Sequence, residues 1–521
     1  NKAPGPDGFN AFFFKHCWNL VGPLVTKAVK EFFSTNQLLA ESNSTIISLI
    51  PKIPNPTSMG EFRPISCCNT VYKCISKIIS KRLQGILPDI IDSSQSAFVK
   101  GRRLCDNVLL AQDIMRDYHK TRGKPRAAAK VDLMKAYDTI SWDFLFDLLG
   151  ALNFPTSMIS WIKAYVSTTR YSINFNGESV GYFKGARGLR QGDPMSPYLF
   201  VIIMDFLGQI FKTEIAKTPG FKYHWRCDKL AISHICFADD LLIFFDGSIQ
   251  SAAVVRNVLS SFYDFTGLLA NKQKSCLYLA AVDDELSHSI GQVTQFPPGK
   301  LPVRYLGVPL ISTKLTKRDC TELIKKIASR ILSWNSKFLS YAGRVQLIQT
   351  VLLGIQNFWA SMFILPKSVL KEVEALLRKF LWTGGLESSY GAKIAWDKVC
   401  KDKREGGLGF KNTIQLNNVL NLKHIWSIFQ NSAQSLWVKW IHTYMLKGKS
   451  LWVVKSPATC SWSWKKLLRL RSLARQLLSH RVGNGEHTFL WYDNWHSLGP
   501  LVEKFGDRVS YDSGLPLNSK V

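Results

Sequence analysis

The sequence predicts an α+β fold for about its first 310 residues, followed by a mostly helical region. Short runs of β-forming apolar residues occur in pairs, as in residues 230–236 and 241–245, and helical patterns separate these pairs. Beyond Leu310 the strand signals fade and helical spacing predominates. Such alternation favours layers of helices and antiparallel strands over a doubly wound parallel sheet.

Each element follows from its local pattern. Apolar residues at helical spacing predict helices, and short β-branched or alternating runs predict strands. Asn176-Gly177 is a strong hairpin signal within a strand-turn region at residues 171–183. Residues 51–64 are expected to form an ordered loop or short strands, residues 127–133 a strand, and residues 185–194 a loop. The expected helices are residues 24–39, 71–83, 141–152, 196–211, 251–266, 316–332, 343–353 and 368–382.

The charge balance indicates a polyanionic partner. The 521 residues include 67 Lys and Arg against 38 Asp and Glu, a net charge of +29. Residues 311–521 are the more basic part, with 32 basic and 13 acidic residues against 35 and 25 before them. Excess positive charge with interspersed aromatics is typical of nucleic-acid binding. Ten of the 16 Trp residues follow position 381, where core packing and base stacking both remain open roles.

Cysteine usage and hydropathy indicate an intracellular protein, and we expect it in the nucleus and cytoplasm. The eleven cysteines form no CxxC pair and no Cys/His spacing of a tetrahedral zinc site. No signal peptide is visible, and the longest apolar stretch, residues 351–365, is interrupted by polar side chains. We therefore expect no membrane partner. The chain begins at Asn1 and a motif begins at once, so we expect a fragment of a longer protein.

The acidic pair Asp239-Asp240 is the strongest chemical signal. It lies between two β-like runs and predicts a hairpin whose tip carries negative charge. Asp132 also follows directly on a short apolar strand, and two strand-end carboxylates converge only if their strands are neighbours in one sheet. Converging carboxylates would form an oxygen-only site suited to two Mg²⁺ ions, which catalyse nucleotidyl transfer. By itself the pair could instead be a solvated turn, and Asp132 could be a helix N-cap.

An ordered series of motifs gives the pair a context. The chain resembles the reverse transcriptases of LINE-type non-LTR retrotransposons, in particular the plant forms, over about residues 1–310 and more faintly to its end. The motifs that carry the resemblance are residues 1–8 (NKAPGPDG), 50–53 (IPKI) with 62–66 (FRPIS), 95–102 (QSAFVKGR) with Asp106-Asn107, 131–138 (VDLMKAYD), 188–194 (GLRQGDP) with Ser196-Pro197, 237–240 (FADD), 267–274 (GLLANKQK) and 305–309 (YLGVP).

The resemblance implies a set of site residues. It implies that Asp132, Asp239, Asp240 and the Leu133 carbonyl hold two Mg²⁺ ions, with Mn²⁺ as a possible substitute. Tyr137 would exclude a 2′-hydroxyl by steric clash, although a core role is its alternative. The remaining implied nucleotide contacts are Gln191 and Gly192 near the sugar and base, Lys52 and Arg63 near the triphosphate, where a solvated surface is the alternative, and Lys274 near the leaving pyrophosphate.

The resemblance also implies an architecture and a reaction. We expect a right-hand polymerase, with fingers and palm over residues 1–310 (core about 48–310), a helical thumb over 311–382 and a mostly helical, basic, Trp-rich extension over 383–521. It would join dNTPs to a DNA primer on an RNA template; the oligomeric state is not predicted. Leu269-Ala270 and Gln112-Asp113 depart from the usual family pattern. The alternatives are a group II intron maturase and a catalytically silent nucleic-acid-binding remnant.

Overall fold

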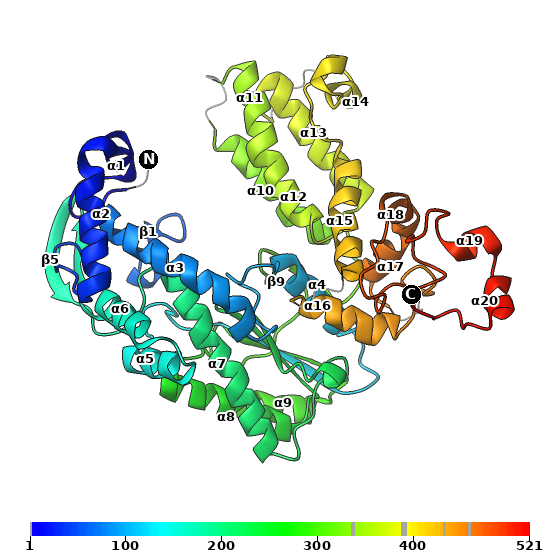
Figure 1. Ribbon diagram of the computed structural model, residues 1–521, viewed down its shortest axis with the longest axis horizontal. Helices are drawn as coiled ribbons and strands as arrows, with labels where there is room; N and C mark the ends of the chain where they lie inside the picture. The colour runs from blue at the N-terminus through cyan, green and yellow to red at the C-terminus, as the bar shows by residue number, and fades with distance from the viewer. Residues whose placement is uncertain (1–2, 335–338, 387–392, 431–433, 457–459) are drawn as a thin grey trace. The chain divides into compact units, whose positions relative to one another are not determined.

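A computed structural model describes residues 3–334, 339–386, 393–430, 434–456 and 460–521. Asn1 and Lys2, the start of the first motif, lie outside the described residues. The chain forms two compact units, drawn together in Figure 1: unit 1 comprises residues 1–102 and 124–299, and unit 2 comprises residues 103–123 and 300–521. The division into fingers, palm, thumb and extension remains a prediction.

Unit 1 contains two four-stranded sheets. The first has the order β2-β1-β4-β5 and combines an antiparallel β1–β2 pair with a parallel β1–β4 pair. The β4–β5 hairpin turns at Asn176-Gly177, whose backbone φ values are both positive, as the sequence predicts. The strands of this sheet are β1 (Ser44–Pro51), β2 (Phe62–Cys68), β4 (Arg170–Phe175) and β5 (Glu178–Lys184).

The second sheet is antiparallel throughout and has the order β6-β7-β3-β8. Its strands are β3 (Arg126–Val131), β6 (His234–Phe237), β7 (Asp240–Phe245) and β8 (Cys276–Ala280). Val131 at the end of β3 pairs with Leu241 at the start of β7. The strands before Asp132 and around Asp239 are therefore neighbours, which is the condition that the sequence argument required.

Helices cover these sheets and complete the core of unit 1. Apolar side chains of β3, such as Ala127 and Ala129, share one buried cluster with Phe200, Ile203 and Leu207 of α7. Helix α8 packs against both α7 and α9, and the three lie side by side in Figure 1. The helices of this unit are α1 (Ala11–His16), α2 (Trp18–Thr35), α3 (Thr70–Ile90), α5 (Trp142–Ala151), α6 (Thr156–Ser167), α7 (Ser196–Lys217), α8 (Ile249–Thr266) and α9 (Asp284–Thr294).

Unit 2 is mostly helical apart from the short β9–β10 pair (Val303–Tyr305 and Val308–Leu310). Helix α10 packs on α12 and α13, and α15 packs on α12, α13 and α17. The helices of this unit are α4 (Leu104–Ile114), α10 (Thr321–Leu332), α11 (Tyr341–Leu347), α12 (Leu353–Ala360), α13 (Lys367–Thr383), α14 (Trp396–Val399), α15 (Thr413–Phe429), α16 (Leu436–Trp440), α17 (Trp462–Arg469), α18 (Arg471–Leu477), α19 (Leu501–Phe505) and α20 (Arg508–Ser513).

Several expected boundaries differ from the observed ones. The helix expected to reach residue 39 ends at Asn36, which adopts the left-handed conformation of a helix stop. Strand β6 begins only at His234, because Ala231 is also left-handed and interrupts the apolar run. The helix expected at 343–353 contains a π-helical turn at Ile348–Leu352. Among the tryptophans after position 381, five are buried, so core packing accounts for them: Trp396, Trp437, Trp440, Trp464 and Trp491.

None of the helices in the described ranges combines the length and apolar character needed to cross a bilayer.

Candidate active site

Asp132, Asp239 and Asp240 meet at one end of the antiparallel sheet of unit 1. Asp132 follows the last residue of β3, and Asp239 lies in the two-residue turn between β6 and β7. Asp240 is the first residue of β7 and pairs with Phe237 across the turn. The turn begins with Ala238, a non-glycine residue at φ +56°. Three carboxylates from two adjacent strand ends thus gather in a small region.

Backbone contacts hold Asp132 from the side of the β8 segment. The N–H of Asn271 donates to the Asp132 carbonyl at 2.7 Å, and the Asp132 N–H donates to Ser275 Oγ at 3.1 Å. The N–H of Met134 donates to the carbonyl of Leu269 at 2.8 Å. These bonds leave the Leu133 carbonyl outside the pairing, so it remains available as an oxygen ligand.

The electrostatics of the three carboxylates show mutual repulsion. Partial burial on the cleft wall raises the pKa of Asp239, and the nearby Asp132 raises it further, while Arg63 opposes the shift. The pKa of Asp240 is raised by burial and then by Asp239. Within the described ranges, none of the three forms an ion pair. Concentrated negative charge that no ion pair of the described residues neutralises fits a site for divalent cations.

A cleft of about 1000 Å³ opens above Asp132 and Asp239. Its wall contains nine of the ten residues implied by the resemblance, and the tenth, Asp240, lies outside the lining next to Asp239. All of these residues belong to unit 1. The nine are Lys52, Arg63, Asp132, Leu133, Tyr137, Gln191, Gly192, Asp239 and Lys274.

Strands β1 and β2 supply a basic wall. Arg63 is exposed on β2 and acts electrostatically on Asp239. Lys52 follows β1, and its Nζ donates to the Gly60 carbonyl at 2.8 Å. Burial raises the pKa of Asp138, and the nearby Lys52 opposes this shift. The wall therefore faces the carboxylates with cations that a triphosphate could engage.

Tyr137 combines a packing contact with a cleft position. Its ring stacks on Phe200 of α7, with ring centroids 4.8 Å apart and planes 13° from parallel. Burial, assisted by Asp239, raises the pKa of its phenol to about 12, so the hydroxyl is neutral at physiological pH. The structure therefore fits both of the roles considered for this residue, because the ring is packed on one side and lines the cleft.

Gln191 and Gly192 form a loop held against β2. The Gln191 carbonyl accepts from the Ser66 N–H at 2.8 Å. Gly192 has φ +104°, and a Cβ at this position would lie 3.2 Å from the Ser66 carbonyl oxygen. Glycine is thus favoured both by the backbone conformation and by the close approach of β2.

Arg190 and Asp193, the residues on either side of this loop, are buried and hydrogen-bonded. The Arg190 guanidinium lies 4.1 Å from the Tyr72 ring centroid and donates to Asn43 Oδ1 at 2.9 Å and to the Tyr165 carbonyl at 2.8 Å. Asp193 accepts hydrogen bonds from the Tyr165 hydroxyl, from Ser76 Oγ at 2.8 Å, and from the N–H groups of Met195 and Ser196 at 3.0 Å each. We call these contacts the Arg190–Asp193 network.

Lys274 reaches the cleft from a turn that Asn271 organises. The Asn271 side chain accepts from the N–H groups of Gln273 at 3.1 Å and Lys274 at 3.2 Å. The backbone of the same Asn271 binds Asp132, as described above. One residue therefore links the position of Lys274 to that of a carboxylate.

Comparison with known proteins identifies the family. Residues 50–310, half of the chain, match the model described as reverse transcriptase (RNA-dependent DNA polymerase). The chain belongs to the reverse transcriptase family. The transposon TX1 uncharacterized 149 kDa protein of Xenopus laevis is 26% identical over 74% of this chain and 29% of its own length. The Pol polyprotein of the type-2 retrotransposable element R2DM of Drosophila melanogaster is 23% identical over 82% of this chain and 39% of its own length.

These matches confirm the predicted membership among LINE-type non-LTR retrotransposon reverse transcriptases and the α+β polymerase fold. The chain spans about a third of the length of the two relatives. Reverse transcriptases generally use divalent metal ions. Among solved structures, telomerase from Candida Tropicalis with a fragment of telomeric RNA aligns with 82% of this chain and 68% of that chain, at 11% identity and a TM-score of 0.40, which is too distant to add to the family match.

Among the cleft residues to which the sequence assigned no role are Asp138, Arg190 and Asn271. Each lies inside a quoted motif, and Asp138 and Arg190 directly adjoin the assigned residues Tyr137 and Gln191. The motifs therefore signalled their positions, but their contacts depend on loops that only the folded chain brings together.

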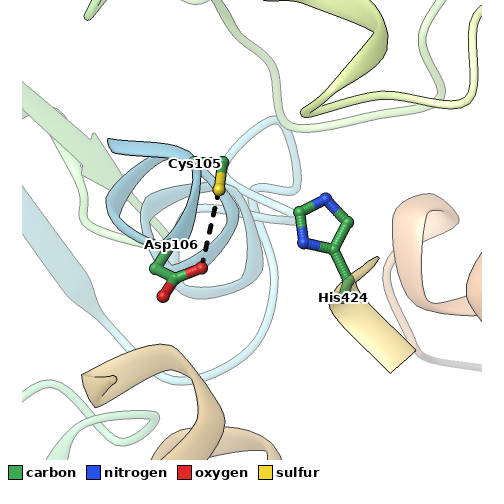
Figure 2. A group of neighbouring side chains, drawn as sticks. All are labelled: Cys105, Asp106 and His424. Carbon is green, nitrogen blue, oxygen red and sulfur yellow. Dashed lines mark hydrogen bonds between the residues drawn. The ribbon is translucent and has the colours of Figure 1, made fainter. Parts of the chain in front are cut away.

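A second cluster of potential metal ligands lies in unit 2, but its carboxylate already has partners within the protein. Figure 2 shows Cys105, Asp106 and His424, whose potential ligand atoms lie within 4.8 Å of one another. Asp106 already accepts from Arg103 at 2.7 Å and from Ser435 Oγ at 2.8 Å. Burial and Asp106 raise the pKa of the Cys105 thiol to about 12. The carboxylate is neutralised within the protein, so we assign no metal ion to this group.

Proposed function

We propose that this chain is an RNA-directed DNA polymerase. The single observation that carries the proposal is the convergence of Asp132 and Asp239 in a cleft that also contains Lys52, Arg63 and Tyr137. A nucleic-acid template fits the family, the net charge of +29 and the basic character of residues 311–521. The proposed partners are an RNA template, a DNA primer and dNTPs.

The donor set fits two Mg²⁺ ions, and Mn²⁺ offers the same coordination chemistry. The ligands would be the carboxylates of Asp132, Asp239 and Asp240 and the Leu133 carbonyl, all of them oxygen donors. When bound, such ions activate the attacking hydroxyl and stabilise the charge on the leaving group of an in-line displacement.

The protein residues provide the remaining functions in this proposal. Lys52 and Arg63 would neutralise the triphosphate, and Gln191 with Gly192 would bind the sugar and base at close range. Tyr137, backed by Phe200, would form the floor beneath the sugar and reject a 2′-hydroxyl. The new bond joins the primer 3′-oxygen to the α-phosphorus of the dNTP, and the bond to the pyrophosphate breaks. Lys274 would donate a proton to that leaving group.

Primer extension tests the proposal directly. We expect residues 1–521 to incorporate dTTP on poly(rA)/oligo(dT) in the presence of Mg²⁺, and Asp239→Ala to abolish incorporation. Replacing Mg²⁺ with Mn²⁺ should retain activity, whereas chelation should remove it. An inactive wild-type chain would contradict the polymerase assignment, and activity that survives Asp239→Ala would contradict the site.

A further inference from the structure

Gln95 is a buried residue next to the candidate active site that the proposed mechanism leaves without a role. It is 2% exposed and belongs to the segment that follows α3 in the sequence of unit 1. Its backbone runs beside β6 as a parallel bridge to Cys236. The Cys236 N–H donates to the Ser94 carbonyl at 2.8 Å, and the Ser96 N–H donates to the Cys236 carbonyl at 3.1 Å. This segment therefore reaches the turn that carries Asp239.

The Gln95 amide binds both backbone groups of Ala238. Its Oε1 accepts from the Ala238 N–H at 3.1 Å, and its Nε2 donates to the Ala238 carbonyl at 3.4 Å. Oε1 also accepts from the Ala97 N–H at 3.0 Å. The opposite orientation of the amide would place its NH₂ against two N–H donors, so the contacts determine which end is oxygen. We call the paired contacts to Ala238 the Gln95 bracket.

Ala238 is the residue whose conformation directs Asp239. At φ +56° it occupies the left-handed region, which costs a non-glycine residue about 1–2 kcal/mol. The β6–β7 turn contains only Ala238 and Asp239 between the paired residues Phe237 and Asp240. A change in the Ala238 backbone therefore redirects the Asp239 carboxylate with no intervening residue to absorb it.

We propose that Gln95 is a positioning residue that holds the Ala238 peptide in its left-handed conformation and thereby aims Asp239 at the metal ions. The catalytic consequence rests on the proposed polymerase function, whereas the bracket itself does not. Gln95 touches neither substrate nor metal in this role. It acts through Ala238 alone.

A different residue anchors the segment that contains Gln95. The Arg102 guanidinium donates to the carbonyls of Ile91 at 2.6 Å, Asp92 at 2.5 Å and Gln95 at 2.6 Å. Together with the backbone bridge to Cys236, these bonds hold the segment without the Gln95 side chain. Removing the side-chain amide should therefore affect the turn more than the segment itself.

The test compares Gln95→Met with Gln209→Met in the full chain. Methionine matches glutamine in length but removes both contacts to Ala238 and the contact to the Ala97 N–H, and Gln209 is an exposed glutamine of α7 in the same unit. Hydrogen exchange is measured across residues 234–241, and kcat and KM for dTTP are measured by primer extension. In Gln95→Met we expect faster exchange at Ala238 with Cys236 still protected, because within residues 234–241 the Ala238 N–H loses its acceptor while the Cys236 N–H keeps the Ser94 carbonyl.

We also expect kcat to fall roughly 10- to 100-fold with little change in KM, because misplacing a catalytic group by about 1 Å has an effect of this order. Gln209→Met should behave as the wild type in both measurements. Adding Ala238→Gly to Gln95→Met should restore part of kcat, since glycine adopts positive φ without strain. If Gln95→Met does not fold, Gln95→Asn withdraws the amide by one methylene, and the same results are expected.

Two results would overturn the inference: unchanged exchange at Ala238 in the Gln95 variants, or unchanged kcat in an active enzyme despite faster exchange. These outcomes are separable from failure of the proposed function. An inactive wild-type chain would reject the polymerase assignment, while exchange at Ala238 would still decide whether the bracket holds the turn.

Discussion

Two acidic regions of unit 1 differ in how their carboxylates are satisfied. Asp193, 3% exposed, accepts hydrogen bonds from the hydroxyls of Ser76, Tyr165 and Ser196 and from two backbone N–H groups, and Arg190 is part of the same network. Asp132, Asp239 and Asp240 form no ion pair in the described ranges and raise one another's energy when charged. The first region stabilises the fold, whereas the second keeps its charge available for a ligand. The number of protein partners of a carboxylate thus separates a structural acid from a candidate metal ligand.

The largest expected effect is at Asp239. We expect Asp239→Asn to reduce primer extension by roughly 10³-fold, because a group that stabilises developing charge is lost. The free energy of unfolding should stay the same or rise, because the substitution removes repulsion from Asp132. Urea denaturation and primer extension on the same preparation measure both. A large loss of stability would place Asp239 with the structural acids.

Asp193→Ala should show the reverse pattern. It removes one member of a buried charged network and leaves Arg190 without its acidic neighbour, which we expect to lower the free energy of unfolding by about 3–5 kcal/mol. The midpoint and slope of urea unfolding report this change. Stability equal to that of the wild type would show that the network is not the structural element we describe.

Tyr165→Phe should give a smaller effect of the same kind. It removes the hydroxyl that donates to Asp193 and retains the ring beside the Arg190 guanidinium. A hydrogen bond to a charged group contributes about 1.5–3 kcal/mol. Urea unfolding checks the value. Additivity with Asp193→Ala in the double variant would contradict a direct bond, since coupled residues deviate from additivity.

The smallest effect on stability is expected at Asp205 of α7. Its carboxyl group has a raised pKa, as that of Asp239 has, but it also accepts a hydrogen bond from the protein, as Asp193 does. It accepts from the Asp92 N–H at 2.7 Å, and burial raises the pKa of its carboxyl group from the usual 3.8 to about 6. Between these values the folded chain binds more protons than the unfolded chain, so this group lowers stability as pH rises. Asp205→Asn should therefore gain stability relative to the wild type at pH 7 but not at pH 4. An equal difference at both pH values in urea unfolding would refute this assignment.

The sequence predicted the secondary-structure elements around the candidate active site well because their signals are local. The β-forming runs around Asp239 and the Asn176-Gly177 turn each determine their structure from a few neighbouring residues. The motif series supplied the residues of the cleft wall. The Gln95 bracket was not predicted, because it joins residues 143 positions apart through a turn whose left-handed alanine has no sequence signature.

The second unit shows the limits of pattern reading more clearly. Helix α4 was not among the expected helices, although residues 103–123 belong to unit 2. Its apolar residues surround most of its circumference, so no amphipathic face marks it; Val108, Leu109, Leu110 and Ala111 are all buried. Which elements bury such a helix depends on contacts with residues far along the chain, and spacing carries no information about them.

The membership of α4 in unit 2 has a consequence for synthesis of the chain. Its partner helix α16 includes Trp437, whose Nε1 donates to Asp113 Oδ2 at 3.2 Å, 324 positions later. At about 5–20 residues per second, α4 would wait roughly 15–60 s on the ribosome before α16 could cover the surface that it packs on. A protein truncated after residue 310 would lack α16, so that surface would stay exposed permanently. Aggregation of such shortened products would therefore reflect the uncovered helix α4 rather than a defect in unit 1.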